Sequence, residues 1–293
     1  MRVFVRTNHD TERCRGDAIM AHEPTNTKQD TAAVEAAPSP TQVISNTAAI
    51  TIIEHGPYVV TGDVPLYEDV LVEASDGAHL QYNRLKEYEV GATYRLCRCG
   101  ASQHMPFCDG AHVHAHSCGD FDGTETASRE PYEERTHVFD GAELELHDDK
   151  RCAFARLCHR RDGSVWEMMR DTNANKQELI AASWQCPTGR LEHHDKQTGQ
   201  AYEQTFEPSI VLLEDPKKHA SGPVFVRGGI PLVSADGSVY ENRNRYALCR
   251  CGASSDKPFC DARHWHIGFQ DGSDAFDGAV GVHDESFKDR PEL

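Results

Sequence analysis

The stretch YRLCRCGASQHMPFCDGAH at residues 94–112 returns as YALCRCGASSDKPFCDARH at residues 246–264. Thirteen of the nineteen aligned positions are identical, and both copies follow the spacing C-x-C-x8-C-x3-H. The residues that can bind a metal are therefore repeated: Cys97, Cys99, Cys108 and His112, then Cys249, Cys251, Cys260 and His264. Three thiolates and one imidazole form a ligand set that suits zinc or an iron–sulfur centre. The repeat predicts a metalloprotein with at least two sites.

The spacing of the ligands favours an iron–sulfur centre over zinc. Zinc sites mostly use C-x2-C or H-x3-H arms, and C-x-C is too tight for most of them. Ser102 or Ser254 and a Pro-Phe turn bring the third cysteine back toward the C-x-C pair, and Asp109 or Asp261 stands where a helix can begin. A cysteine and a histidine four residues apart at a helix start can point at one centre. A small zinc module with the same ligands is the alternative.

The repeated pattern resembles the signature of the CDGSH iron–sulfur family, the mitoNEET-like proteins, in which C-x-C is followed by P-x-C-D-G-x-H. The resemblance implies a 2Fe–2S cluster in each copy. It implies that the C-x-C cysteines hold one iron, and that the third cysteine and the histidine hold the other. The second copy reads CDARH, which keeps the ligands but replaces the usual glycine.

The repeat extends beyond the ligands. GPYVVTGDVPL at 56–66 is matched by GPVFVRGGIPL at 222–232, with six of eleven positions identical. Each segment is followed by an Asp-Gly pair, Asp76-Gly77 or Asp236-Gly237, which predicts a turn. The alternating segments YVVTG and VFVRG predict short strands. The repeat is therefore a whole module, and the family resemblance implies that two such modules pair, here within one chain.

A different pattern lies between the repeats. Cys152, Cys158 and the Cys186-Pro187 pair resemble a single-cluster bacterial ferredoxin, in which C-x2-C-x2-C precedes a helix and a Cys-Pro ending. Ala155 stands where the middle cysteine of that pattern belongs. The resemblance implies a 3Fe–4S cluster on the three remaining cysteines. KQELIAASW at 176–184 predicts the helix before the last ligand, and VWEMM at 165–169 predicts a strand.

Two alternatives apply to this middle segment. His159, Cys118 or an external thiol could supply a fourth ligand, which would give a 4Fe–4S cluster instead. The three cysteines could also be buried core thiols, which behave as small hydrophobic residues.

Composition limits the classes of function. The net charge is −17, and the absence of a basic stripe argues against nucleic-acid binding. The apolar runs are too short for a membrane span, and the N-terminus lacks a signal-peptide core. We therefore expect an intracellular protein, in the cytoplasm or, in a eukaryote, in an organelle. In a reducing compartment, the eleven cysteines are better explained as metal ligands than as disulfides.

Together these patterns predict an α+β protein in which two small β-rich CDGSH modules flank a ferredoxin-like α+β insert. The length of 293 residues suits two or three small domains. The predicted ranges are a disordered tail over 1–45, the first module over 46–118, a linker over 119–142, the ferredoxin-like domain over 143–200, the second module over 208–272 and a tail over 273–293.

The expected function follows from the ligand chemistry. Sites whose ligands all come from the protein leave no open position for a substrate, and the chain shows no phosphate loop or flavin fingerprint, so we expect no enzyme. We expect one-electron transfer with a redox partner protein. Transfer of a cluster to an apo-protein, redox or pH sensing, and a zinc-stabilised interaction module are the alternatives. Histidine ligation predicts loss of the visible bands below about pH 6.

Overall fold

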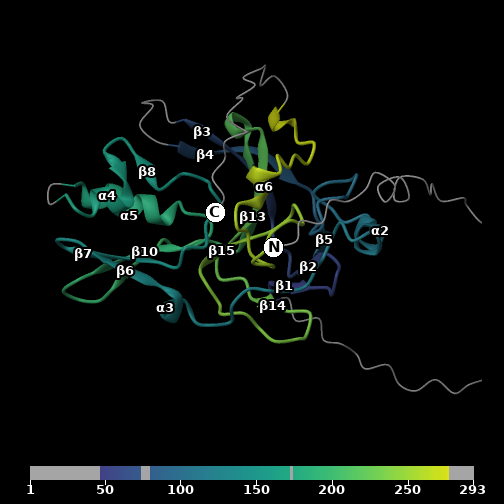
Figure 1. The fold of residues 1–293 in the computed structure, drawn as a ribbon, viewed down its shortest axis with the longest axis horizontal. Coiled ribbons are helices and arrows are strands. Elements are labelled where there is room, and N and C mark those ends of the chain that lie inside the picture. Colours follow the sequence, from purple (N-terminus) through teal and green to yellow (C-terminus); the bar gives the residue numbers. More distant parts are fainter. Residues whose placement is uncertain (1–46, 74–79, 172–173, 277–293) are drawn as a thin grey trace, which may run out of the picture. The chain divides into compact units, whose positions relative to one another are not determined.

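The computed structural model describes residues 47–73, 80–171 and 174–276 (Figure 1). The predicted tail over 1–45, the Asp76-Gly77 pair and residues 277–293 of the second tail lie outside these ranges. The predicted Asp236-Gly237 turn is confirmed, because the Gly237 N–H donates to the Ser234 carbonyl at 3.0 Å.

Two sheets form the repeated part of the chain. The first has the strand order β14-β1-β2-β5, with β1 (Ala49–Ile52), β2 (Tyr58–Thr61), β5 (Thr93–Leu96) and β14 (Leu232–Val233). The second has the order β15-β13-β12-β3-β4, with β3 (Leu66–Glu73), β4 (Leu80–Tyr88), β12 (Ser209–Asp215), β13 (Ala220–Arg227) and β15 (Arg245–Leu248). The segments YVVTG and VFVRG lie in β2 and β13, so both strand predictions are confirmed.

Each sheet combines strands of both modules. β14 of the second module pairs in parallel with β1, placing Leu232 opposite Ile50. β3 of the first module pairs in parallel with β12, placing Leu66 opposite Ile210. Leu66 and Leu232 are the equivalent last residues of the repeated eleven-residue segment. The two modules therefore exchange equivalent strands, and neither sheet is complete without the other module.

The exchanged strands enclose one hydrophobic core. Strands at its edge show the alternation of a half-buried strand, as in β2 and β5, whereas every residue of β12 is buried. The core draws on both modules about equally, with Ile50, Tyr58, Val60, Leu66 and Leu96 from the first and Ile210, Val224, Val226, Leu232 and Leu248 from the second. Burial of this shared apolar surface holds the two modules together.

The middle segment forms an α+β unit of its own (teal in Figure 1). Its antiparallel sheet has the order β11-β10-β7-β6, with β6 (His137–Asp140), β7 (Leu144–Asp148), β10 (Leu191–Asp195) and β11 (Ala201–Tyr202). A two-stranded ribbon and two helices accompany it: β8 (His159–Arg160), β9 (Gly163–Ser164), α4 (Val165–Met168) and α5 (Lys176–Trp184). The sheet begins at His137, inside the range predicted as a linker.

One of the two element predictions for this unit is confirmed and the other is wrong. KQELIAASW forms α5, whose first turn is capped by the Asn175 side chain. VWEMM was predicted as a strand but forms the short helix α4. The Ser164 side chain accepts from the Glu167 N–H while the Glu167 carboxylate accepts from the Ser164 N–H, and this capping box starts a helix.

The remaining elements are short. They are α2 (Ala111–Ser117), α3 (Tyr132–Arg135), α6 (Arg263–His266) and two 3-10 turns, η1 (Pro216–Lys218) and η2 (Asp274–Phe276). Within the described ranges, none of the helices has the length and apolar character needed to cross a bilayer.

Candidate metal centres

The first ligand set lies in the loop between β5 and α2. The sulfur atoms of Cys97 and Cys99 are 3.7 Å apart, and the Cys108 sulfur lies 3.3 Å from Nδ1 of His112. The loop is folded back by two backbone hydrogen bonds, from Cys97 N–H to the Pro106 carbonyl and from Cys108 N–H to the Arg95 carbonyl. The four predicted ligands therefore form two donor pairs.

The second ligand set repeats this geometry. The Cys249 and Cys251 sulfur atoms are 3.7 Å apart, and the Cys260 sulfur lies 3.3 Å from Nδ1 of His264. In both loops a serine hydroxyl binds the carbonyl of the phenylalanine before the third cysteine, at 2.6 Å for Ser102 and 2.7 Å for Ser254. This contact confirms that the serine and the Pro-Phe turn close the loop.

Aspartates follow the third cysteine in both loops and fix the start of the helix. Asp109 accepts from the Gln103 N–H at 2.8 Å and from the Ala111 N–H at 3.0 Å. Asp261 accepts from the Ser255 N–H at 2.8 Å and from the Arg263 N–H at 3.1 Å. Each carboxylate thus ties the loop to the first helical turn, which sets the direction of the histidine.

The change from Gly to Ala in the second motif leaves the backbone unchanged. Gly110 has φ 91°, and Ala262 at the equivalent position has φ 69°, so both are left-handed. An alanine in this region is disfavoured because its Cβ crowds the backbone. The buried surroundings of Ala262 hold it there all the same.

The donors of each site do not converge on one point. Within the described part of the chain, no group of three or more His, Cys, Asp or Glu side chains is placed to hold a single metal ion. Each site instead offers a sulfur–sulfur pair and a sulfur–nitrogen pair. Separations of 3.7 Å and 3.3 Å allow the two donors of each pair to bind the same metal atom.

The thiols of each site differ in protonation, because burial raises the pKa of Cys108 and of Cys260 above the usual value of a thiol. Hydrogen bonding from Cys99 lowers the pKa of Cys97 to about 6, and the same interaction from Cys251 lowers the pKa of Cys249 to about 7. Burial lowers the pKa of His112, and burial lowers that of His264 further, to about 3. One thiolate and a neutral imidazole are therefore available at each site near neutral pH.

The arginine inside each C-x-C pair is a buried anchor. Arg98 donates to three backbone carbonyls, those of Ile53, Gly56 and Gly123. Arg250 donates to the Gly222 and Leu213 carbonyls and also forms ion pairs with two buried carboxylates. These carboxylates are Glu214 and Asp271. Among the described residues, carboxylates thus neutralise the guanidinium charge at the second site and not at the first.

The two ligand loops touch each other. Cys99 and Cys251 form an antiparallel backbone bridge. A side chain on Gly100 would lie 2.6 Å from the Cys251 carbonyl oxygen, and one on Gly252 would clash with the Cys99 carbonyl oxygen. Tyr58 of the first module donates its hydroxyl to the Cys249 carbonyl at 2.8 Å. The two candidate centres are therefore neighbours within one chain.

The middle cysteines are brought into one region. Cys186 is buried, and Cys152 and Cys158 are half-buried. Burial, with a further contribution from the charges of Cys186 and Cys152, raises the pKa of Cys158 to about 12, so both thiols lie within electrostatic range of Cys158. The Cys152 sulfur accepts from the Phe154 N–H at 3.3 Å. Of the suggested fourth ligands, His159 is exposed on β8 and Cys118 caps the end of α2.

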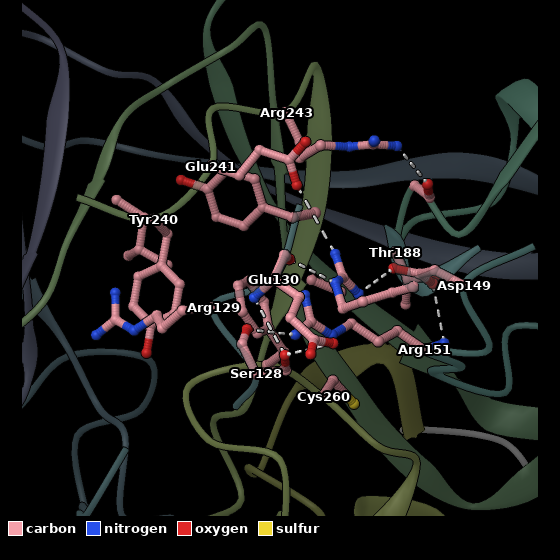
Figure 2. Close-up of a pocket in the computed structure, with 16 residues that line it drawn as sticks. Ser128, Arg129, Glu130, Asp149, Arg151, Thr188, Tyr240, Glu241, Arg243 and Cys260 are labelled. Carbon is pink, nitrogen blue, oxygen red and sulfur yellow. Dashed lines mark hydrogen bonds and ion pairs between the residues drawn. The ribbon is translucent and has the colours of Figure 1, made fainter. Parts of the chain in front are cut away.

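A small cavity lies between the second module and the middle unit. It has a volume of about 30 Å³ and is lined by charged and aromatic side chains from both, with Cys260 at one edge (Figure 2). A larger cleft of about 800 Å³ shares part of this lining and also reaches Cys152. Cys260 of the second ligand set and Cys152 of the middle unit therefore border the same cleft.

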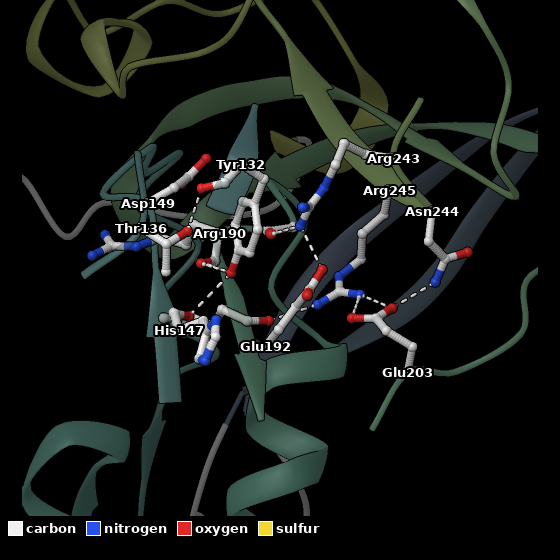
Figure 3. A network of polar contacts seen from close by, with 12 residues as sticks. Tyr132, Thr136, His147, Asp149, Arg190, Glu192, Glu203, Arg243, Asn244 and Arg245 are labelled. Carbon is white, nitrogen blue, oxygen red and sulfur yellow. Dashed lines mark hydrogen bonds and ion pairs between the residues drawn. The ribbon is translucent and has the colours of Figure 1, made fainter. Parts of the chain in front are cut away.

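A polar network fastens the middle unit to the second module (Figure 3). The buried Arg245 donates to the carbonyls of Ser183, Cys186 and Leu191 at 2.9–3.0 Å. It also forms an ion pair with Glu203. Because Arg245 lies on β15, three residues before Leu248, the network ties the region of Cys186 to the strand that leads into the second C-x-C pair.

Sequence reasoning missed several residues that support the sites. Tyr58 contacts the second ligand loop from 191 residues away, and Glu214 and Asp271 contact it from 36 and 21 residues away. Only Tyr58 lies in the repeated segment, and the second copy has Val224 at the same place. No local spacing marks such long-range partners.

Comparison with known proteins agrees with the ligand geometry. Residues 55–113 and 221–265 each match the family described as Iron-binding zinc finger CDGSH type. No curated protein and no solved structure matches the chain. The two matched regions contain all eight repeated ligands, and the three middle cysteines lie outside them. The chain therefore carries two copies of the CDGSH-type iron-binding domain.

Proposed function

We propose that the protein is an iron–sulfur protein that acts in one-electron transfer and holds a 2Fe–2S cluster at each CDGSH-type domain. The observation that carries this proposal is the division of each ligand set into two pairs with the same separations, 3.7 Å between sulfur atoms and 3.3 Å between sulfur and Nδ1. Two pairs match the two irons of such a cluster. In the first site, Cys97 and Cys99 would hold one iron and Cys108 and His112 the other.

The residues of the chain set the properties of such a centre. When bound, a 2Fe–2S cluster supplies reversible exchange of single electrons. A neutral imidazole in place of a thiolate removes one negative charge from the ligand set and favours a higher potential. The serine and aspartate contacts hold both donor pairs in place before a metal binds, so little rearrangement is needed. All four ligands come from the protein, which leaves no position for a substrate.

We further propose that Cys152, Cys158 and Cys186 hold a 3Fe–4S cluster in a ferredoxin-like unit. Phe154 and Arg156 have positive φ values of 59° and 61°, and such turns point backbone N–H groups inward, as at anionic sulfide clusters. Ala155 packs in an apolar cluster with Leu71 and Leu157, so this position would supply no fourth ligand to a cluster held by the three cysteines. Helix α5 precedes Cys186, as the ferredoxin pattern requires.

Transfer of a cluster to an acceptor protein is a second candidate. The observation in its favour is the partial exposure of Cys108 and His112, which an incoming thiol could reach. A His112→Cys change would bind iron more tightly and stop donation, whereas reversible electron exchange would persist.

Anaerobic purification tests the main proposal. We expect a red-brown protein that contains iron and inorganic sulfide and little zinc, and that is reduced and reoxidised without loss of colour. An EPR signal from the oxidised protein is expected from the 3Fe–4S centre, and signals from the 2Fe–2S centres are expected after reduction. A coloured protein without the oxidised signal would overturn the middle centre alone. A colourless protein with stoichiometric zinc would overturn the redox function.

A further inference from the structure

The two CDGSH-type domains differ in how far their ligands are buried. In the second site Cys260 is 3% exposed and His264 is 6% exposed. In the first site the equivalent Cys108 and His112 are both half-buried. The donor geometry is the same in the two sites, so the difference comes from what surrounds them.

A segment of the middle unit covers the second site. Ala153 packs directly against Cys260 and Ala247 in a small buried cluster. The Phe154 ring stacks on Trp265, the residue after the ligand His264, with centroids 4.3 Å apart and an angle of 20° between the rings. The left-handed conformation of Phe154 turns the chain at this point. The cover therefore sits over the pair formed by Cys260 and His264.

Polar contacts hold this cover in place. The Arg151 Nε donates to Asp256 at 3.1 Å, and its guanidinium lies 4.2 Å from the centre of the Phe259 ring. Both partners belong to the second ligand loop. From another segment, the Thr126 and Ala127 N–H groups both donate to the Lys257 carbonyl, at 2.8 and 2.9 Å. The second loop is thus fixed from two sides.

Among the residues that the structure describes, no equivalent segment covers the first site. Val113, the residue after the ligand His112, is 64% exposed. Gln103, His104 and Asp109 of the same loop are also exposed. The cleft of about 800 Å³ does reach the edge of Cys260 at the second site, but His264 does not line it.

We propose that the first domain is the one that exchanges electrons or a cluster with an external protein, and that the segment Arg151–Phe154 closes the second domain to such partners. This inference rests on the proposed function, since it assigns the exchange to one of the two sites. It also gives the middle unit a role beyond its own cysteines. We expect the external partner to contact Cys108 and His112. This cysteine–histidine pair is partly exposed, whereas the equivalent pair Cys260 and His264 is buried.

Iron release tests the inference on the full, metal-loaded chain. With the bulky anionic chelator bathophenanthroline disulfonate, we expect two phases, in which the first domain loses iron at least about tenfold faster, because release from the second requires local opening of its cover. Phe154→Ala should accelerate the slow phase only. Val113→Ala, at the equivalent open position of the first site, should leave the slow phase unchanged. Equal release from both domains would overturn the inference.

Alkylation of the metal-free chain gives an independent readout. With N-ethylmaleimide and peptide mass mapping, Cys108 should react before Cys260, and Phe154→Ala should raise the Cys260 rate without changing the Cys108 rate. Arg151→Gln removes the contact of the guanidinium with Asp256 but keeps the stack of Phe154 on Trp265, and it should also raise the Cys260 rate. An unchanged Cys260 rate in both variants, with folding verified by thermal melting, would contradict the cover. A protein that binds no iron would overturn the proposed function. The alkylation rates would still show whether Cys260 is less accessible than Cys108.

Discussion

At the scale of single residues, the two domains share their ligands but not the groups around them. Arg98 and Arg250 occupy the same place between two cysteines, yet in the described part of the chain Arg250 alone forms ion pairs with carboxylates. Glu54 and Glu214 are equivalent in the repeat, since each follows a residue whose carbonyl binds the arginine. Glu54 is exposed, whereas Glu214 is fully buried. Identical motifs therefore sit in different electrostatic surroundings.

The buried Glu214 predicts a pH dependence of stability. Burial raises its pKa to about 7, with Arg250 opposing and Asp271 adding to the shift. The folded chain then holds this proton more tightly than the unfolded chain, so the contribution is complete below about pH 4.5 and is lost as pH rises through 7. The free energy of unfolding should fall by at most about 3 kcal/mol over this window.

Chemical unfolding of Glu214→Gln between pH 4.5 and 7.5 checks this expectation. The variant should lose that slope relative to the native chain, and Glu54→Gln at the exposed equivalent position should keep it. The same slope in all three proteins would show that Glu214 does not carry the proton.

The left-handed alanine of the second motif predicts a stabilising substitution. Ala262→Gly removes the crowding of Cβ and should raise the free energy of unfolding by about 1 kcal/mol. Gly110→Ala at the equivalent position should lower it by a similar amount, since nothing lies within 4 Å of the added Cβ and only the backbone conformation is penalised. Thermal melting of both variants measures these changes against the native chain. A loss of stability in Ala262→Gly would contradict the strain.

At the scale of elements, the repeat allowed the strands and ligands to be predicted but not their partners. Leu66 and Leu232 end the same repeated segment, so pairing within a module and pairing between modules look alike in the sequence. Only the contacts of β14 with β1 and of β3 with β12 reveal the exchange. The error at 165–169 arose because a short apolar run fits a strand or a buried helix, and the capping box of Ser164 and Glu167 decided it.

The contact between the two ligand loops predicts a sensitive glycine. In Gly252→Ala, the new Cβ would clash with the Cys99 carbonyl and also sit at φ 77°. We expect a loss of more than about 2 kcal/mol, because the backbone bridge between Cys99 and Cys251 must shift in addition to the conformational penalty.

Gly237→Ala is the matched control for this substitution. Gly237 has φ 84°, but nothing lies within 4 Å of its Cβ position, so only the penalty of about 1 kcal/mol remains. Urea unfolding of the two variants separates the cost of the clash with the Cys99 carbonyl from the cost of the backbone conformation. Equal losses in Gly252→Ala and Gly237→Ala would mean that the close approach of the two loops is absent.

At the scale of the whole molecule, two CDGSH-type domains and the middle unit place their ligand sets side by side. The first and second sets meet at the Cys99–Cys251 bridge, and Cys260 of the second set and Cys152 of the middle unit border the same cleft. The sequence indicated three groups of cysteines, but the order in space depends on Arg245 and on the cover at Arg151–Phe154. Both are long-range contacts between units, which residue spacing does not encode.

The central claim is that each CDGSH-type domain holds a pair of irons on two donor pairs. Mössbauer spectroscopy of the ⁵⁷Fe-enriched, dithionite-reduced protein tests it most directly, because it distinguishes the irons of each cluster. We predict ferric and ferrous iron in equal amounts from the two domains, with the ferrous component altered in both His112→Cys and His264→Cys. A spectrum of isolated mononuclear iron, or a protein that holds zinc in place of iron, would contradict the account.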